Sequence, residues 1–384
     1  MKQYKIGIIG YGGFGKFLHH WWNKLDGVQV VALWGGTPDD PQPDVKQYQN
    51  WEELLEDQDI DIVSIATPPA LHVEMACKAM RAGKHVLLEK PVALTSAGAE
   101  EILKVQRETG MVITVDHMLR YDPIVASLIQ LSKDETFGKL RHALVSNYAQ
   151  DESLPADHWF WDKTMAGGIF VEHAVHFFDI VNAMANQKVA RVSGFTHRRN
   201  AHQEDQVSAT VLYENGLIAS HYHSFSGPGF FEQTTIRLTY DLARIEIEGW
   251  VPMKGSFQAL VTQSDKQKLD VLPGLAIDKT TAVAELADAS RPEGWGDVSG
   301  TDRTSVRCGG IAYRVDELVS GTFKLAQTKS ETYGSCVQRI LSDIIAKVEN
   351  PDHALSITVQ DAFESLKIAL SADQSASGSY SQGH

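Results

Sequence analysis

The 384-residue chain contains few cysteines and no long apolar run. Cys77, Cys308 and Cys336 lie far apart and lack the close spacing of a metal-binding or redox pair, which is typical of a protein from a reducing compartment. No stretch approaches the roughly 18 consecutive apolar residues of a membrane span. The N-terminus also lacks a basic segment followed by a long apolar run, the pattern of a secretory signal. We therefore expect a cytoplasmic protein that does not cross a membrane.

Basic residues are also scarce. The chain has 35 lysines and arginines against 49 aspartates and glutamates, for a formal net charge of −14. Nucleic acids and anionic membranes both bind basic surfaces, so we expect neither as a partner. The 43% hydrophobic and 22% charged residues are typical of a globular protein, and the length favours two domains.

The chain opens with a predicted strand at 4–9, a glycine-rich turn and a helix. The turn is Gly10-Tyr11-Gly12-Gly13-Phe14-Gly15. In this G-x-G-x-x-G pattern, the first glycine permits a tight turn, the second lets the backbone approach a pyrophosphate, and the third allows close packing of helix on strand. The helix N-terminus offers free N–H groups and a positive dipole end to the phosphates. The pattern therefore predicts a dinucleotide site that includes Gly13 and Phe14.

The choice of dinucleotide depends on the residues after the second predicted strand, at 29–34. In such sites an acid about 20 residues past the glycines binds the adenosine ribose. Here that place is taken by Gly35 and Gly36, and the first acids are Asp39 and Asp40. They are either ribose ligands or solvated acids of a Pro/Asp-rich turn. No arginine lies nearby to hold a 2′-phosphate, so NAD is favoured over NADP.

Helices and strands alternate over the rest of the first third of the chain. We predict helices at 51–55, 71–82 and 95–109, and strands at 60–66, 85–88 and 111–116. This alternation implies right-handed crossovers and a parallel, doubly wound α/β sheet of the Rossmann type.

The second part of the chain has a different pattern. Strands are predicted at 139–148, 189–198, 205–213, 217–225, 234–240 and 244–248. Short turns such as Glu214-Asn215-Gly216 join them, which indicates a mostly antiparallel sheet. Helices are predicted at 335–349 and 358–372, while the polar region 263–310 receives no role. We therefore expect a Rossmann domain at 1–120, an α+β domain at 121–373 and a flexible tail at 374–384.

The predicted strand at 85–88 ends at Glu89-Lys90-Pro91. Pro91 cannot continue a central strand, and ligands of open α/β sheets bind beyond the carboxyl ends of the strands. Lys90 should therefore face the binding crevice. On this evidence alone, Lys90 either forms a surface ion pair or acts on a substrate.

A second group of polar residues follows Gly167-Gly168. Glu172, His176 and Asp179 are spaced i, i+4, i+7, so they share one face of a predicted helix. One explanation is a core helix with a structural histidine. Another is a metal site formed by Glu172, His173 and His176, but the H-E-x-x-H order is missing and we predict no metal. His221 and His223 alternate on one strand face and are expected to be structural.

These motifs together resemble the glucose-fructose oxidoreductase/inositol dehydrogenase (Gfo/Idh/MocA) family. The resemblance is carried by the GYGGFG turn, by Ala66-Thr67-Pro68-Pro69 with His72 after it, by Glu89-Lys90-Pro91 and by Gly167-Gly168 with His176 and Asp179. It covers essentially the whole chain and implies a C-terminal domain with an open, mostly antiparallel sheet, through which homodimers or homotetramers form. Glu172 stands where the family usually has aspartate, and Ala174 where it usually has glycine.

The resemblance also implies roles for residues. Lys90 would lie beside the nicotinamide and touch the reacting oxygen of the substrate. The implied cofactor-binding residues are Gly10, Gly12, Gly13, Phe14, Gly15, Thr67, Pro68, His72, Glu89 and Lys90. The candidate substrate-binding residues are His117, Arg120, Trp159 and His173. A structural ion pair is the alternative for Arg120, and a position near an interface is the alternative for Trp159.

The chemistry of these residues agrees with a dehydrogenase. Oxidation of a carbinol carbon requires removal of the hydroxyl proton, which suits a neutral histidine. A carboxylate can orient the imidazole, and a lysine favours negative charge on the oxygen. We therefore predict His176 as the base, Glu172 as its orienting or substrate-binding partner and Lys90 as the electrostatic group of an NAD(P)-dependent oxidoreductase acting on a sugar, cyclitol or related polyol. The alternatives are redox-neutral glycoside cleavage or epimerisation with tightly bound cofactor, and a cofactor-binding sensor without catalysis.

Overall fold

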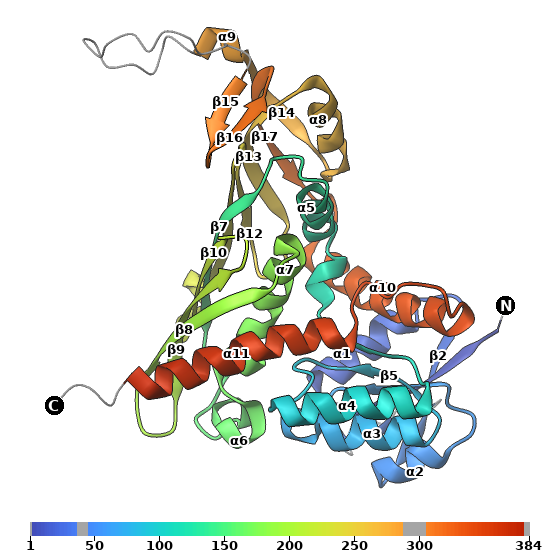
Figure 1. The fold of residues 1–384 in the computed structure, drawn as a ribbon. Helices are drawn as coiled ribbons and strands as arrows, with labels where there is room; N and C mark the ends of the chain where they lie inside the picture. Colours follow the sequence, from blue (N-terminus) through green and yellow to red (C-terminus); the bar gives the residue numbers. More distant parts are fainter. Residues whose placement is uncertain (1, 37–44, 287–304, 380–384) are drawn as a thin grey trace.

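The computed structural model describes residues 2–36, 45–286 and 305–379. Figure 1 shows a smaller sheet with its helices beside a larger sheet that rises away from it. The candidate ribose ligands Asp39 and Asp40 lie outside the described residues. None of the helices in the described part of the chain combines the length and apolar character that a membrane crossing needs.

The first domain is built on a parallel sheet of six strands in the order β3-β2-β1-β4-β5-β6. Its strands are β1 (Tyr4–Ile9), β2 (Val28–Trp34), β3 (Lys46–Tyr48), β4 (Ile62–Ile65), β5 (His85–Leu88) and β6 (Ile113–Val115). Its helices are α1 (Gly13–Trp22), α2 (Trp51–Glu56), α3 (His72–Arg81) and α4 (Ser96–Thr109). The doubly wound prediction is confirmed. Strand order reverses between β1 and β4, which places a ligand crevice beyond the carboxyl ends of these strands.

Local signals set the helix ends in this domain. The Oγ1 of Thr95 accepts a hydrogen bond from the Gly98 N–H at the start of α4. Gly110 ends the helix with φ of 69°, a left-handed conformation that glycine adopts without strain. The helix predicted at 95–109, with Gly110 behind it, is therefore confirmed at both ends.

The second domain contains a nine-stranded sheet in the order β14-β17-β13-β12-β11-β7-β10-β9-β8. The predicted strands are present as β7 (Leu140–Gln150), β8 (Val189–Arg198), β9 (Glu204–Tyr213), β10 (Ile218–Gly227), β11 (Gln233–Tyr240) and β12 (Ala243–Glu248). Strand β10 pairs in parallel with β7, and the other neighbouring pairs are antiparallel. The prediction of a mostly antiparallel sheet is confirmed.

Several elements extend this domain beyond the prediction. The sheet continues through β13 (Lys254–Val261), β14 (Ala276–Ala282) and β17 (Glu317–Lys324), and β15 (Ser305–Cys308) pairs separately with β16 (Ile311–Arg314). The described part of the polar region also contains the short helices α8 (Gln263–Lys268) and α9 (Val283–Leu286). Within this region, β14 therefore adds the edge strand at one end of the sheet.

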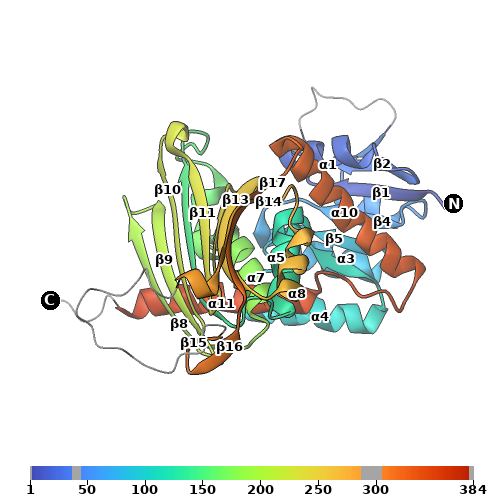
Figure 2. The same cartoon turned by 90° about the horizontal axis from the view of Figure 1, so that it is seen from above.

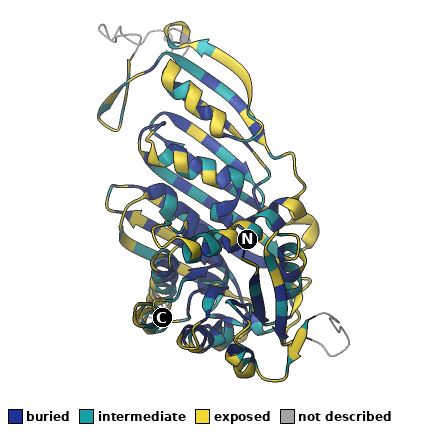
Figure 3. Ribbon diagram, turned by 90° about the vertical axis from the view of Figure 1, so that its right-hand side faces the viewer, coloured by how far each residue is buried: buried dark blue, intermediate teal, exposed yellow. Residues whose placement is uncertain are grey.

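The larger sheet has a helix-covered face and an open face. Helices α5 (Pro123–Lys133), α7 (Val175–Ala185) and α11 (Val359–Ser379) lie on the side toward the first domain (Figure 2). Buried and exposed residues alternate along the strands, as can be followed in Figure 3. The exposed set includes large apolar side chains, namely Tyr148 (49% exposed), Phe195 (65%), Leu212 (37%) and Ile218 (44%).

The last helices return to the first domain. Helix α10 (Lys329–Glu349) packs on α1, where the Trp22 Nε1 donates to the Val337 carbonyl over 2.9 Å. Helix α11 lies across β8 and also contacts α4 (Figure 1). Elements far beyond residue 120 therefore also pack on the first domain, and the boundary at 120 stays a prediction. Residues 374–379, expected in a flexible tail, instead complete α11, and 380–384 lie outside the described residues.

Candidate active site

A cavity of about 370 Å³ opens beyond the carboxyl ends of β4, β5 and β6, where the two domains meet. It is lined from the first domain by Phe14, Ala66, Thr67, Pro69, Glu89, Lys90, Asp116 and Met118. The second domain and α10 supply Leu154, His158, Trp159, Phe160, Glu172, His173, His176, Phe225, Trp250 and Tyr333. Lys90 and His176 therefore border the same space.

The glycine turn has room for phosphates in front of α1. A Cβ on Gly10 would lie 2.4 Å from the Ala66 carbonyl oxygen, and one on Gly15 would lie 2.3 Å from the Gly10 carbonyl oxygen. A Cβ on Gly12 or Gly13 would meet no atom within 4 Å. The first pair of glycines thus closes the turn, whereas the second pair leaves open space at the helix N-terminus. This arrangement fits a dinucleotide pyrophosphate.

Lys90 joins the two domains inside the cavity. Its ammonium forms an ion pair with the Glu172 carboxylate, and its Nζ donates to the Glu172 carbonyl oxygen over 2.8 Å. The two side chains are only 15% and 12% exposed. Burial raises the pKa of Glu172, but Lys90 and His173 outweigh it, so the pKa lies below its ordinary value. Glu172 is therefore ionised and fixes the ammonium in place.

The helix that carries the second group of residues begins with an irregular turn. Residues Phe170–Ala174 form a π-helical turn, η4, and α7 starts at Val175. Glu172, His173 and His176 line the cavity, whereas Asp179 is fully buried and does not line it. The predicted α-helix therefore begins at Val175, so that Glu172 lies in the π turn while His176 and Asp179 lie three residues apart in α7.

His176 is held in its neutral form. It is 5% exposed, and burial lowers its pKa well below the ordinary value, with the charge of Lys90 acting in the same direction. His173 lies beside it, with its Nε2 bonded to the Asn147 Oδ1 over 3.0 Å, and burial lowers its pKa to about 4. The ring of His117 packs edge-on against His176 at 6.1 Å. A neutral imidazole of this kind can accept a proton.

Two buried carboxyl groups face the same cavity. Glu89 and Asp116 follow the neighbouring strands β5 and β6. Burial raises the pKa of Glu89 well above its ordinary value, and the adjacent Asp116 raises it further. Burial also raises the pKa of Asp116. Two close carboxylates resist joint ionisation, so each of the two groups makes its neighbour harder to ionise.

His72 has a supporting position. It is fully buried, and its Nδ1 and Nε2 lie 2.8 Å from the Pro91 carbonyl oxygen and 2.9 Å from the Thr67 carbonyl oxygen. It therefore ties the turn after β4 to the segment after Lys90, and its role in cofactor binding stays a prediction. In the adjoining turn, Pro69 lines the cavity, and Pro68 is absent from its lining within the described residues.

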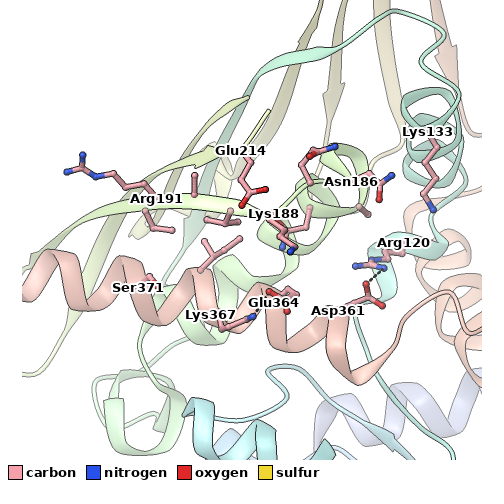
Figure 4. Close-up of a pocket in the computed structure, with 17 residues that line it drawn as sticks. Arg120, Lys133, Asn186, Lys188, Arg191, Glu214, Asp361, Glu364, Lys367 and Ser371 are labelled. Carbon is pink, nitrogen blue, oxygen red and sulfur yellow. Dashed lines mark ion pairs between the residues drawn. The ribbon is translucent and has the colours of Figure 1, made fainter. Parts of the chain in front are cut away.

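Arg120 and His117 do not line this cavity among the described residues. The Arg120 guanidinium binds both oxygens of Asp179, over 2.6 and 2.7 Å. It borders a separate cavity of about 910 Å³ between α7, β8 and α11, where Asp361 approaches it at 3.6 Å (Figure 4). The structure thus shows the structural ion pair that was the alternative for Arg120, and a substrate contact by Arg120 stays a prediction. His117 lies behind His176, only 1% exposed.

The cavity also contains residues that were not predicted from the sequence. Trp250 follows Gly249 after β12, and Tyr333 comes from α10. Phe225 comes from β10, and Asn147 of β7 holds His173. These residues carry no local signal, because distant parts of the chain bring them together. Asp116 did carry a local signal, because it directly follows β6, the strand beside the one that Glu89 follows.

Comparisons with known proteins agree with this architecture. Residues 4–117 match the family model described as "Oxidoreductase family, NAD-binding Rossmann fold" (GFO_IDH_MocA). Residues 125–246 match the model described as "GFO/IDH/MocA C-terminal domain". Both halves of the cavity therefore belong to matched segments, apart from Met118, Trp250 and Tyr333.

Named relatives are similar over part of their length. The chain is 30% identical over 188 residues to 1,5-anhydro-D-fructose reductase of Ensifer adhaerens, covering 47% of this chain and 55% of that protein. It is 26% identical over 214 residues to a scyllo-inositol 2-dehydrogenase (NADP(+)) of Bacillus subtilis, covering 54% and 60%. The chain thus spans less than two thirds of these relatives.

A solved structure is similar over nearly the whole chain. The myo-inositol 2-dehydrogenase from Lactobacillus plantarum has a TM-score of 0.71 at 20% identity, with 98% of each chain covered. At this identity the likeness shows the shared fold.

Proposed function

Since the chain belongs to the Gfo/Idh/MocA oxidoreductase family, we propose that it is an NAD(P)-dependent dehydrogenase or reductase. Its substrate is a sugar, cyclitol or related polyol, and hydride moves between a hydroxyl-bearing carbon and the nicotinamide. The observation that carries this proposal is the shared cavity of Lys90, Glu172 and His176, which adjoins the glycine turn through Phe14. The names of the reductase and inositol dehydrogenase relatives support the substrate class.

The cofactor is held by the first domain. The N–H groups at the start of α1 bind the pyrophosphate in the space before Gly12 and Gly13. Thr67, Glu89 and Lys90 border the nicotinamide end. When bound, the nicotinamide accepts or supplies the hydride. NAD remains the favoured form because the sequence offers no arginine after β2.

The chain's own groups handle the proton and the charge. In the oxidation direction, neutral His176 removes the hydroxyl proton of the substrate. The Lys90 ammonium stabilises negative charge on the same oxygen. Glu172 pairs with Lys90, so its role is to position the ammonium for the substrate oxygen. Aromatic rings of Trp159, Trp250 and Tyr333 supply apolar walls against which a sugar ring can pack.

The open face of the larger sheet supports a further part of this proposal. Tyr148, Phe195, Leu212 and Ile218 make it suitable for association with a second copy, as a homodimer or homotetramer. The cytoplasmic location expected from cysteine usage belongs to the same proposal.

A substrate screen with two variants tests the function. Sugars and polyols are supplied with NAD and NADP, and nicotinamide absorbance is followed. Lys90→Ala and His176→Ala should each lower kcat by about 10²-fold to 10⁴-fold, because each removes a group that acts in the transition state. Cofactor affinity, measured by fluorescence titration, should stay close to that of the wild type.

Lys188→Ala is the matched control, since this lysine borders the separate 910 Å³ cavity, and its turnover should be unchanged. Full activity in both site variants would contradict the assignment. Product formation without a net absorbance change would favour the redox-neutral alternative instead.

A further inference from the structure

A second cavity, of about 410 Å³, adjoins the candidate active site. His158 and Phe160 line both cavities. A second stretch of chain also lines both cavities. Gly168 and Ile169 border the second cavity, and Glu172, His173 and His176 border the first. The two spaces therefore follow one another along the same two stretches of chain, 154–163 and 167–176.

The size of the first cavity limits what it can hold. At about 370 Å³ it is near the lower end of the roughly 300–1,000 Å³ typical of small-molecule sites. It must accommodate both the nicotinamide end and the reacting unit of the substrate. Any further unit of the substrate has to extend outward, and the second cavity provides a space of similar size next to it.

The lining of the second cavity contains side chains of both charges. Lys163 and Arg198 supply positive charge, and Asp157, Asp162 and Glu204 supply carboxyl groups. Lys163 is already paired with Asp373 and lies 4.0 Å from the Glu204 carboxyl. Because neither sign dominates, the lining favours a neutral ligand with many hydroxyl groups over an ion.

Buried and exposed groups share this lining. The Glu204 side chain is 9% exposed, and its Oε1 accepts a hydrogen bond from the Ile169 N–H over 3.2 Å. Burial raises the pKa of Glu204. Arg198 and His202 are exposed at the outer rim of the same cavity. A ligand would therefore meet a fixed inner wall and adjustable outer side chains.

His158 stands between the two spaces. Its Nδ1 accepts the Phe160 N–H over 3.2 Å, which leaves Nε2 to carry the proton of the neutral ring. This N–H is available to donate to an oxygen that joins two substrate units.

We propose that the 410 Å³ cavity binds the second ring of a glycosidically linked substrate whose first ring reacts in the 370 Å³ cavity. The substrate class is therefore a disaccharide or a glycoside of similar length, with the rings joined near His158. This inference rests on the proposed sugar or polyol oxidoreductase function and names its substrate class.

Paired substrates and a rim variant provide the test. The holoenzyme is assayed with glucose, galactose and myo-inositol, and with cellobiose, lactose and maltose. A disaccharide should show a higher kcat/KM than its component sugar. The double variant Arg198→Ala/His202→Ala should lower kcat/KM for that disaccharide about 10-fold or more, the effect of losing two hydrogen bonds. The kcat/KM for the single sugar should change less than about 2-fold.

Arg191→Ala is the control for this variant, because Arg191 is also exposed on β8 but borders the separate 910 Å³ cavity. It should leave both classes of substrate unaffected. Equal kcat/KM for single and linked sugars, or an equal loss for both in the rim variant, overturns the second-ring site and leaves the proposed function standing. Absence of turnover with every sugar and both cofactors overturns both.

Discussion

Glu172 shows how one residue sets the geometry of the cavity. Its carboxylate and its main-chain oxygen both bind Lys90, so the ammonium has two partners from the same residue. Glu172 follows Gly168 and Ile169, and it lies in the wide turn η4. The longer side chain and the wider turn together bring the carboxylate to a lysine from the other domain.

Substitution of Glu172 tests this positioning role. Glu172→Gln keeps the shape of the side chain but leaves the buried ammonium without a counter-charge. We expect kcat to fall by up to roughly 100-fold, since a misplacement of about 1 Å can cost that much. Cofactor affinity should change little. Glu172→Asp restores the charge and should recover part of the loss in kcat. A Gln variant with wild-type kcat would show that the ion pair is only structural.

At the scale of elements, the glycines of the turn have two different roles. Some allow close packing of the backbone, and others leave open space for a ligand. Gly15→Ala would force its Cβ against the Gly10 carbonyl oxygen, at 2.3 Å, and we expect a loss of about 3 kcal/mol in stability. Gly13→Ala places its Cβ in open space at the start of α1. Its unfolding free energy without cofactor should stay within about 1 kcal/mol of the wild type.

The Gly13→Ala methyl group occupies the space in front of the helix, so cofactor affinity should fall about 10-fold by titration calorimetry. Urea denaturation measures the stability of both variants. If Gly13→Ala binds NAD as tightly as the wild type, the phosphates do not lie at this helix end.

Elements with strong periodicity or clear end signals were predictable from the sequence. Thr95 and Gly110 mark the ends of α4, and Pro91 marks the end of the strand that presents Lys90. The turn η4 was not predictable, because no local signal around Glu172 distinguishes a π turn from an α turn. Strand β14 was missed because its residues are mostly exposed and polar, as in a loop. The candidate residues Lys90, Glu172, His173 and Trp159 line the cavity, and their roles stay predictions. Trp250 and Tyr333 reach it through packing between distant parts of the chain.

At the scale of the whole molecule, buried imidazoles link stability to pH. Burial lowers the pKa of His117, His173, His176, His221 and His223. The folded protein keeps these rings neutral, whereas the unfolded chain protonates them near pH 6.5. The unfolded state therefore binds more protons below that pH, and the contribution of these groups to stability is lost as the pH falls.

His221 offers the simplest test, because burial alone lowers its pKa, to about 3. Its ring packs against Phe178 at 4.6 Å, so His221→Phe should be accommodated. Between pH 8 and pH 5 the wild type should lose about 2 kcal/mol more stability than this variant, as measured by urea denaturation. The raised pKa values of Glu89 and Asp116 make stability rise as the pH falls, but both groups are present in both proteins. The difference in stability loss between the two proteins therefore reports His221 alone.

His20→Gln is the control, because His20 is exposed, and it should show the wild-type pH dependence. An identical loss for wild type and His221→Phe would mean that His221 is protonated in the folded state.

The packing of α10 on α1 determines when the first domain can complete its contacts during folding. Trp22 has 0% exposure, and its indole N–H is satisfied by Val337, more than three hundred residues later. While the chain is being synthesised, this indole N–H lacks its partner until α10 has left the ribosome. A fragment ending at residue 120 would lack that partner altogether. The first domain, although it is synthesised first, therefore obtains its last packing contacts only after α10 has been made.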